Sequence, residues 1–237
     1  MKSPSELRIE VSPGATTTAV VYPGADVRVR PHAFRPTLIL AHGAGAGQRS
    51  PFMIAFARAL AALGIDVVTF NFLYTERRRN MPDKAPVLEA CYRAVIDAVR
   101  TEVQPDPARG ALFIGGKSMG GRIATQVAAA DRELRLDGLV LLGYPLHPPG
   151  RPEQRRDAHL PAVARPMLFV QGSRDTFGTP SELSPVLAAL DPPPVLHVVA
   201  GGDHSFKVAR TDAAKQAAVY DDIRRTIVDW IAHLLAT

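Results

Sequence analysis

The sequence has 237 residues, of which 46% are hydrophobic and 22% are charged, and its formal net charge is +5. These fractions are typical of a globular protein and exclude an intrinsically disordered chain. No apolar run approaches the roughly 18 residues that a membrane-spanning helix needs, and the first residues lack the apolar stretch of a signal peptide. We therefore expect no membrane association and one domain over residues 1–237. The only cysteine, Cys91, cannot form an intrachain disulfide and fits the reducing cytoplasm, the expected location.

The basic residues are mostly arginine, and their distribution argues against a nucleic-acid partner. One cluster is Arg77-Arg78-Arg79 and a looser group lies within residues 151–165, but no aromatic side chains interleave with either. Proteins that bind single-stranded nucleic acids combine basic clusters with aromatic stacking platforms. We therefore expect no nucleic-acid binding. The sequence gives no indication of an oligomeric state.

The pattern of apolar residues predicts one α/β domain. Two strands, joined by the turn Ser12-Pro13-Gly14, are predicted near the N-terminus, and beyond them short apolar runs alternate with amphipathic segments. This alternation is typical of a doubly wound parallel sheet covered on both faces, with the N-terminal pair as an antiparallel edge. The predicted strands are 7–11, 17–22, 37–41, 65–70, 111–115, 139–142, 167–171 and 195–199, and the predicted helices are 51–63, 85–103, 118–130, 181–190 and 212–235.

A candidate nucleophile lies between a predicted strand and a predicted helix. The residues there are Gly116-Lys117-Ser118-Met119-Gly120, a G-x-S-x-G motif in the context that forms a nucleophile elbow. Such a turn needs small residues on both sides of the serine and lifts its hydroxyl above the sheet. The alternative is a glycine-rich turn with an incidental serine. A P-loop is excluded because Ala111, within the strand, occupies the position of its first glycine.

A general base and an orienting acid are expected after later strands. Asp175 follows the strand 167–171 and His204 follows the strand 195–199, so both lie at the edge of the sheet where Ser118 lies. The alternatives are that Asp175 only caps a turn and that Asp203 is the acid. The remaining histidines without such a position are expected to be structural or solvated: His32, His147, His159, His197 and His233.

Two backbone N–H groups are candidates for an oxyanion hole. One is that of Met119, the residue after the nucleophile. The other is assigned to Ala44 in the loop His42-Gly43-Ala44-Gly45-Ala46-Gly47, where glycines allow the backbone to approach a substrate. His42 is expected to anchor this loop. A dinucleotide site is not favoured there, because Gln48 replaces the third glycine and Asn71 stands where an acidic residue is required.

These motifs resemble those of the α/β-hydrolase superfamily over nearly the whole chain, in particular small dienelactone-hydrolase-like members that lack a lid. The His-Gly-Ala-Gly opening and the Gly-x-Ser-Met-Gly-Gly-Arg elbow are similar to those of predicted bacterial hydrolases, and of a testis-expressed protein and a histone acetyltransferase scaffold subunit in animals. The resemblance implies an α/β-hydrolase fold and a serine hydrolase with no metal and no organic cofactor. Dienelactone hydrolases proper have a cysteine nucleophile, whereas this chain has Ser118.

The substrate is expected to be a small acyl compound with an anionic or polar acyl group. Residues 143–166 form a short insertion near the site, rich in proline and arginine and without the apolar face of a lipase lid. Together with Arg77-Arg78-Arg79 this insertion is expected at the mouth of the sheet, which would make the mouth electropositive. The alternative is that these arginines form a solvated rim.

The sequence is thus interpreted as a serine hydrolase of the carboxylesterase type (EC 3.1.1). It would cleave an ester, thioester or related bond through an acyl-enzyme, with Ser118 as nucleophile, His204 as base and Asp175 as the orienting acid. One alternative belongs to another class, a noncatalytic interaction protein with the same fold. A third is a hydrolase-fold enzyme with peptidase or haloperoxidase chemistry.

Overall fold

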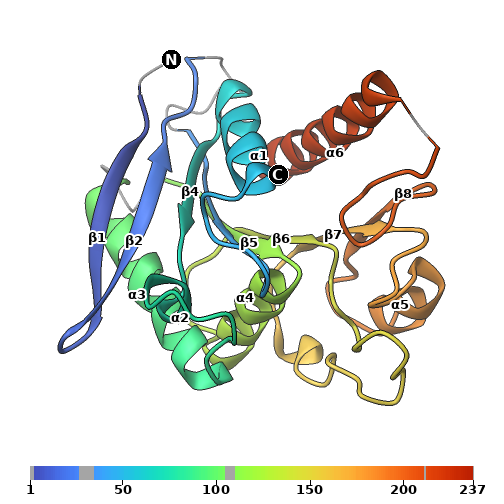
Figure 1. Cartoon of the computed structure of the whole chain (residues 1–237), viewed down its shortest axis with the longest axis horizontal. Helices are drawn as coiled ribbons and strands as arrows, with labels where there is room; N and C mark the ends of the chain where they lie inside the picture. Colours follow the sequence, from blue (N-terminus) through green and yellow to red (C-terminus); the bar gives the residue numbers. More distant parts are fainter. Residues whose placement is uncertain (1–2, 27–34, 105–109, 211, 237) are drawn as a thin grey trace.

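A mostly parallel sheet positions every functional loop of the molecule. Within residues 3–26, 35–104, 110–210 and 212–236, the part of the chain that the computed structural model describes, eight strands pair in the order β1-β2-β4-β3-β5-β6-β7-β8 (Figure 1). His32 lies outside these ranges. The strands are β1 (Ser5–Ser12), β2 (Ala15–Tyr22), β3 (Thr37–Ala41), β4 (Asp66–Phe70), β5 (Leu112–Lys117), β6 (Gly138–Leu142), β7 (Met167–Gly172) and β8 (Val195–Val199).

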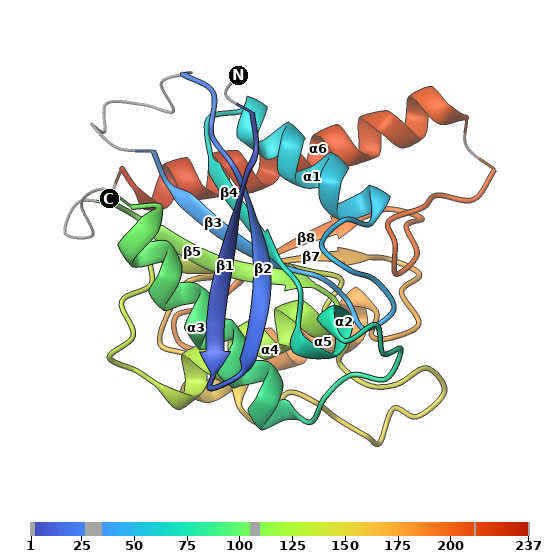
Figure 2. The same cartoon turned by 60° about the vertical axis from the view of Figure 1, so that its left-hand side comes forward.

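The predicted antiparallel edge and parallel centre are both confirmed. β1 pairs antiparallel with β2, and β2 pairs antiparallel with β4, whereas all pairings among β3 to β8 are parallel. Figure 2 shows β1 and β2 as a long hairpin at one edge. β3 and β6 are buried along their whole length because helices cover both faces, which explains their continuous apolar sequences.

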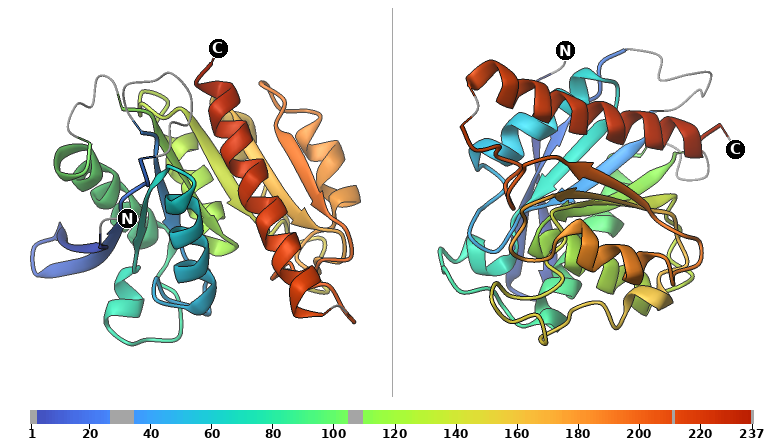
Figure 3. Two further views of the ribbon diagram at one scale, coloured as in Figure 1. Left: turned by 90° about the horizontal axis from the view of Figure 1, so that it is seen from above. Right: turned by 90° about the vertical axis from the view of Figure 1, so that its right-hand side faces the viewer.

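Helices cover the two faces of the sheet unequally. α1 (Pro51–Ala62) and α6 (Ala213–Leu234) pack on one face, and α3 (Ala85–Glu102), α4 (Met119–Ala130) and α5 (Pro180–Leu187) pack on the other (Figure 3). None of the helices in the described residues is both long and apolar enough to span a membrane.

Four elements differ from the predicted ones. The single-turn helix α2 (Leu73–Glu76) and the 3₁₀ turn η1 (Leu160–Ala162) were not predicted, because one turn is too short to show helical periodicity. β5 extends through Lys117, two residues beyond its predicted end, since Gly116 and Lys117 still pair with β6. α5 ends at Leu187, before the predicted residue 190.

A buried tyrosine hydroxyl joins α3 to the centre of the sheet. The Tyr92 hydroxyl donates to the Gly115 carbonyl oxygen at 2.7 Å, accepts from the Gly115 N–H at 3.0 Å, and lies 3.1 Å from the Ile39 carbonyl oxygen. Tyr92 is fully buried. A Cβ atom at Gly115 would lie only 1.9 Å from the Val140 carbonyl oxygen, so no larger residue fits at this position in β5.

His42 anchors the loop after β3, as expected. Its Nδ1 donates to the Gly43 carbonyl oxygen at 2.8 Å, and its Nε2 accepts from the Phe72 N–H at 3.2 Å. An Nε2 that accepts an N–H bond carries no proton, so the imidazole is neutral. Burial lowers the pKa of His42 to about 4, because a charged ring would lose its hydration, although the Gly43 carbonyl oxygen and the charge of Glu76 act in the opposite direction.

The Tyr92 hydroxyl can be tested by removing it. In Tyr92→Phe two backbone groups in the interior would lose their partner, and we expect the free energy of unfolding to fall by about 1–3 kcal/mol in urea titrations. Tyr22→Phe is the matched control, because no hydrogen bond is found for the Tyr22 hydroxyl among the described residues. Equal stability changes in the two variants would contradict this role.

The low pKa of His42 predicts a loss of stability in acid. Between about pH 6.5 and pH 4 the unfolded chain binds a proton at this histidine and the folded protein does not, so stability decreases as the pH falls. This one group should contribute a loss of roughly 2–3 kcal/mol by about pH 4. We expect His42→Gln to reduce the difference between unfolding free energies measured at these two pH values. An unchanged difference would contradict the neutral, buried imidazole.

Candidate active site

Ser118 lies in the sharp turn between β5 and α4. Its backbone has φ 52° and ψ −119°, in the region that is strained for a residue with a side chain. A Cβ atom at Gly116 or Gly120 would lie 2.6 Å or 2.5 Å from the Ala41 carbonyl oxygen, so both positions require glycine. The turn therefore has the geometry that the G-x-S-x-G motif predicts.

The structure brings Ser118, His204 and Asp175 together in one hydrogen-bonded series. His204 Nε2 lies 2.8 Å from Ser118 Oγ, and His204 Nδ1 lies 2.8 Å from Asp175 Oδ2. Because an ionised carboxylate can only accept, the proton of the neutral ring belongs on Nδ1, which leaves Nε2 to accept the serine proton. The Phe177 ring stacks on the imidazole with centroids 4.2 Å apart and limits the motion of the ring.

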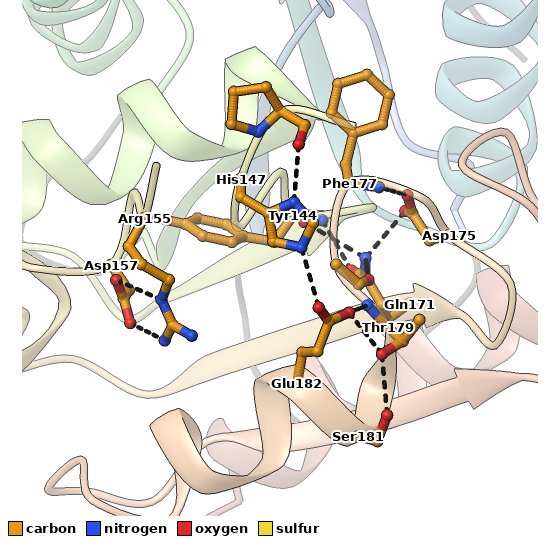
Figure 4. Close-up of polar contacts among 12 residues, drawn as sticks. Tyr144, His147, Arg155, Asp157, Gln171, Asp175, Phe177, Thr179, Ser181 and Glu182 are labelled. Atoms are coloured by element: carbon orange, nitrogen blue, oxygen red, sulfur yellow. Dashed lines mark hydrogen bonds and ion pairs between the residues drawn. The ribbon is translucent and has the colours of Figure 1, made fainter. Parts of the chain in front are cut away.

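Asp175 is completely buried and held by groups beyond His204 (Figure 4). Its Oδ1 accepts from the Phe177 N–H at 2.9 Å, and its Oδ2 accepts from Gln171 Nε2 at 2.9 Å. Gln171 Oε1 in turn accepts from the Tyr144 N–H at 2.8 Å. Gln171 was not among the predicted site residues. A buried glutamine in the otherwise apolar strand β7 nevertheless indicates that its side chain holds another buried polar group.

Asp203, the alternative acid, contacts its own loop instead. Its Oδ1 accepts from the N–H groups of Ser205 and Lys207 at 2.7 Å and 2.9 Å. This carboxylate therefore shapes the loop that presents His204, while Asp175 contacts the imidazole.

The other described histidines contact residues outside the series. His147 lies 3.1 Å from Glu182 Oε1 and connects residues 143–166 to α5 (Figure 4). His159 lies 2.8 Å from Thr125 Oγ1, and His197 lies 3.1 Å from Asp222 Oδ2. These three have structural partners and His233 in α6 is exposed, in line with the expectation that these residues are structural or solvated.

The two candidate oxyanion donors flank Ser118. Met119 is the first residue of α4, where the N–H groups have no partner within the helix. The Gly43 carbonyl oxygen accepts from His42 Nδ1 at 2.8 Å and from the Ala46 N–H at 3.2 Å. Because N–H and C=O point in opposite directions in a trans peptide, these bonds also fix the direction of the Ala44 N–H.

Lys117, which was not among the predicted site residues, contacts the loop that carries His204. Its Nζ donates to the His204 carbonyl oxygen at 2.5 Å and lies 5.3 Å from the centroid of the Phe206 ring. Burial lowers the pKa of Lys117 to about 8, although the charges of Asp175 and Asp203 act in the opposite direction. The elbow and the loop after β8 are thus joined directly.

A cavity of about 930 Å³ opens above Ser118. Ser118, His204, Met119 and Ala44 all border it, so four of the five predicted site residues lie on one surface. Aromatic and aliphatic side chains form much of the remaining lining, among them Phe52, Met53, Phe56, Leu88, Phe177 and Tyr220. The described residues contain no group of three or more histidine, cysteine, aspartate and glutamate side chains that could hold a metal ion.

The arginines noted in the sequence differ in whether they border the cavity. Arg77-Arg78-Arg79 are exposed and do not border the cavity, and Arg79 pairs with Asp83. Arg156, from residues 143–166, borders the cavity. Arg122, on the first turn of α4, also borders it and was not considered as a site residue.

Solved structures with the same arrangement of elements come from several bacteria. A serine hydrolase homologue from Coxiella burnetii has 19% identity and a TM-score of 0.71, covering 94% of this chain and 96% of that one. XC6422 from Xanthomonas campestris, a serine hydrolase without a lid, has 23% identity and a TM-score of 0.69, with 95% of each chain covered. Dienelactone hydrolase from Anabaena variabilis has 20% identity and a TM-score of 0.71, covering 97% and 98%.

These likenesses show a shared fold, and the sequence itself matches a family. Residues 34–232 match the family model described as an alpha/beta hydrolase domain. The match includes the loop after β3, the elbow and the loops that carry Asp175 and His204. The chain therefore belongs to the α/β hydrolase family.

Proposed function

We propose that this protein is a serine hydrolase that cleaves a small ester, thioester or related acyl compound through an acyl-enzyme, as carboxylesterases do. The observation that carries the proposal is the continuous series from Ser118 Oγ through His204 to Asp175, with 2.8 Å at both steps. Nucleophile, base and orienting acid within hydrogen-bond distance of each other are the arrangement that serine acylation requires.

In the first half of the reaction Ser118 Oγ attacks the acyl carbon as its proton passes to His204 Nε2. The carbonyl π electrons move to oxygen, and the N–H groups of Met119 and Ala44 stabilise this oxyanion. Asp175 holds the imidazole by Nδ1 and stabilises its positive charge. The intermediate then expels an alcohol or thiol, which takes the proton from Nε2 and leaves the acyl group on Oγ.

The second half repeats the same steps with water. His204 Nε2 accepts a proton from water as its oxygen bonds to the acyl carbon. Collapse of this second intermediate breaks the bond to Ser118 Oγ, which recovers its proton from Nε2 as the carboxylic acid departs. No redox step or further reactant is needed.

The alternative of a noncatalytic interaction protein finds less support. Such a protein would have no need for Ser118 and His204 within hydrogen-bond distance, or for an open cavity above them. The backbone strain at Ser118 points the same way, because strained turns persist where a function requires them.

Covalent labelling tests the nucleophile without knowledge of the substrate. We expect a fluorophosphonate probe to add once to the wild-type protein, as read by intact mass, and to give no stoichiometric adduct on Ser118→Ala or His204→Ala. Ser50→Ala is the matched control, because Ser50 borders the same cavity. This substitution should leave labelling intact. A folded wild-type protein that is not labelled would favour the interaction protein instead.

The identity of the acid is tested by two isosteric substitutions. Asp175→Asn removes the acceptor for His204 Nδ1–H, so the rate constant of labelling should fall roughly 10³- to 10⁴-fold. Asp203→Asn keeps an oxygen for the Ser205 and Lys207 N–H groups and should change the rate constant by less than about threefold. The reverse order would assign the role to Asp203.

A further inference from the structure

Two arginines that border the cavity have no carboxylate partner. Arg122 Nε is buried and without a hydrogen bond, and the closest partner of its guanidinium is Gln126 Oε1, 3.4 Å from Nη1. Among the described residues no acid lies within ion-pair distance of Arg122 or Arg156; the Glu89 charge acts on Arg122 only from farther away. A buried arginine donor without a partner is unusual and calls for a ligand.

Arg122 and Arg156 border the same cavity as the nucleophile Ser118. Burial lowers the pKa of Arg122, and the positive charge of Arg156 acts in the same direction. Arg122 follows Ser118 by one turn of α4, about 6 Å along the helix axis. Both cations therefore border the same cavity as Ser118, and the backbone of Arg122 lies one helical turn from it.

The backbone of residues 143–166 holds Arg156 in place while its side chain stays unpaired. The Arg156 N–H donates to the Leu146 carbonyl oxygen at 2.9 Å, and the Tyr144 hydroxyl donates to the Arg156 carbonyl oxygen at 2.7 Å. The nearby acid Asp157 pairs with Arg155 (Figure 4), which is not among the residues that border the cavity. Arg156 is thus positioned but not neutralised.

The other charges that border the cavity already have partners or are exposed. Asp83 pairs with Arg79, Arg224 pairs with Asp221, and Lys117 donates to the His204 carbonyl oxygen. Lys207 is exposed at the surface. Among the described residues of the lining, Arg122 and Arg156 are therefore the partly buried cations that have neither an acid nor a backbone carbonyl oxygen as partner, whereas Lys207 is a free cation exposed to solvent.

We propose that Arg122 and Arg156 form a carboxylate-binding subsite beside Ser118, which selects esters whose acyl part carries a second carboxylate about three to five bonds from the scissile carbonyl. The inference rests on the proposed serine hydrolase function and specifies its substrate class. Guanidinium groups suit a carboxylate because their planar N–H forks match its two oxygens. The apolar lining would contact the methylene groups between the two ends.

The decisive experiment compares two esters with the same leaving group, and each enzymatic rate is corrected for the spontaneous hydrolysis of that ester, which the neighbouring carboxylate accelerates in the glutarate. For wild-type protein we expect kcat/KM for mono-p-nitrophenyl glutarate to exceed that for p-nitrophenyl pentanoate by roughly 10- to 100-fold, a preference that added salt should reduce. Arg156→Gln and Arg122→Gln should each lower this ratio by about tenfold or more. Arg151→Gln, an exposed arginine of the same insertion outside the cavity, should keep it.

A binding measurement separates this inference from the proposed function. Monomethyl glutarate should bind Ser118→Ala at least about tenfold more tightly than methyl pentanoate in calorimetric titrations, and a second substitution Arg156→Gln should abolish the difference. If the wild-type protein hydrolyses both esters with equal kcat/KM, the proposed carboxylate subsite is wrong, whereas the proposed hydrolase function is supported. If it hydrolyses neither ester but this binding difference is found, the proposed hydrolase function is wrong, whereas the proposed carboxylate subsite is supported.

Discussion

The tight turn at Ser118 is the constraint on which the rest of the site depends. A side chain at φ 52° is stable only when its surroundings fix it, and here β3 approaches so closely that Gly116 and Gly120 have no room for a Cβ atom. The same approach brings the loop of Ala44 beside the serine. One steric condition therefore places both the nucleophile and the candidate oxyanion donors. It is the close backbone contact of β3 with the end of β5 and the start of α4, which glycines make possible.

The second condition is that a carboxylate buried away from water is held by hydrogen-bond donors. Asp175 is completely buried, and the N–H groups of Phe177, Gln171 and His204 surround it. Each bond offsets part of the cost of removing the charge from water. The Lys117 ammonium group donates to the His204 carbonyl oxygen, so the buried polar groups form one connected network. Removing one member would affect its neighbours, and for this reason isosteric substitutions are more informative than truncations.

Much of the fold could be predicted from periodicity and turn residues. β3 has the predicted bounds, and β1, β2, α1, α3 and α4 lie within a few residues of theirs, because long apolar runs and helical spacing are local signals. The elbow and the loops of Asp175 and His204 were also predictable, since parallel strands end at one edge of the sheet. Single-turn elements such as α2 escaped prediction because they contain no full period.

The sequence by itself determined the succession of strands and main helices along the chain, the elbow motif with Ser118, and His204 as the base, and it offered Asp175 as the preferred acid with Asp203 as the alternative. Only the tertiary structure decided between Asp175 and Asp203, revealed Gln171 and Lys117, and placed Arg122 and Arg156, rather than Arg77-Arg78-Arg79, beside the cavity. The physical reason is that a motif is local, whereas hydrogen-bond partners and the neutralisation of charge depend on side chains brought together from distant parts of the chain.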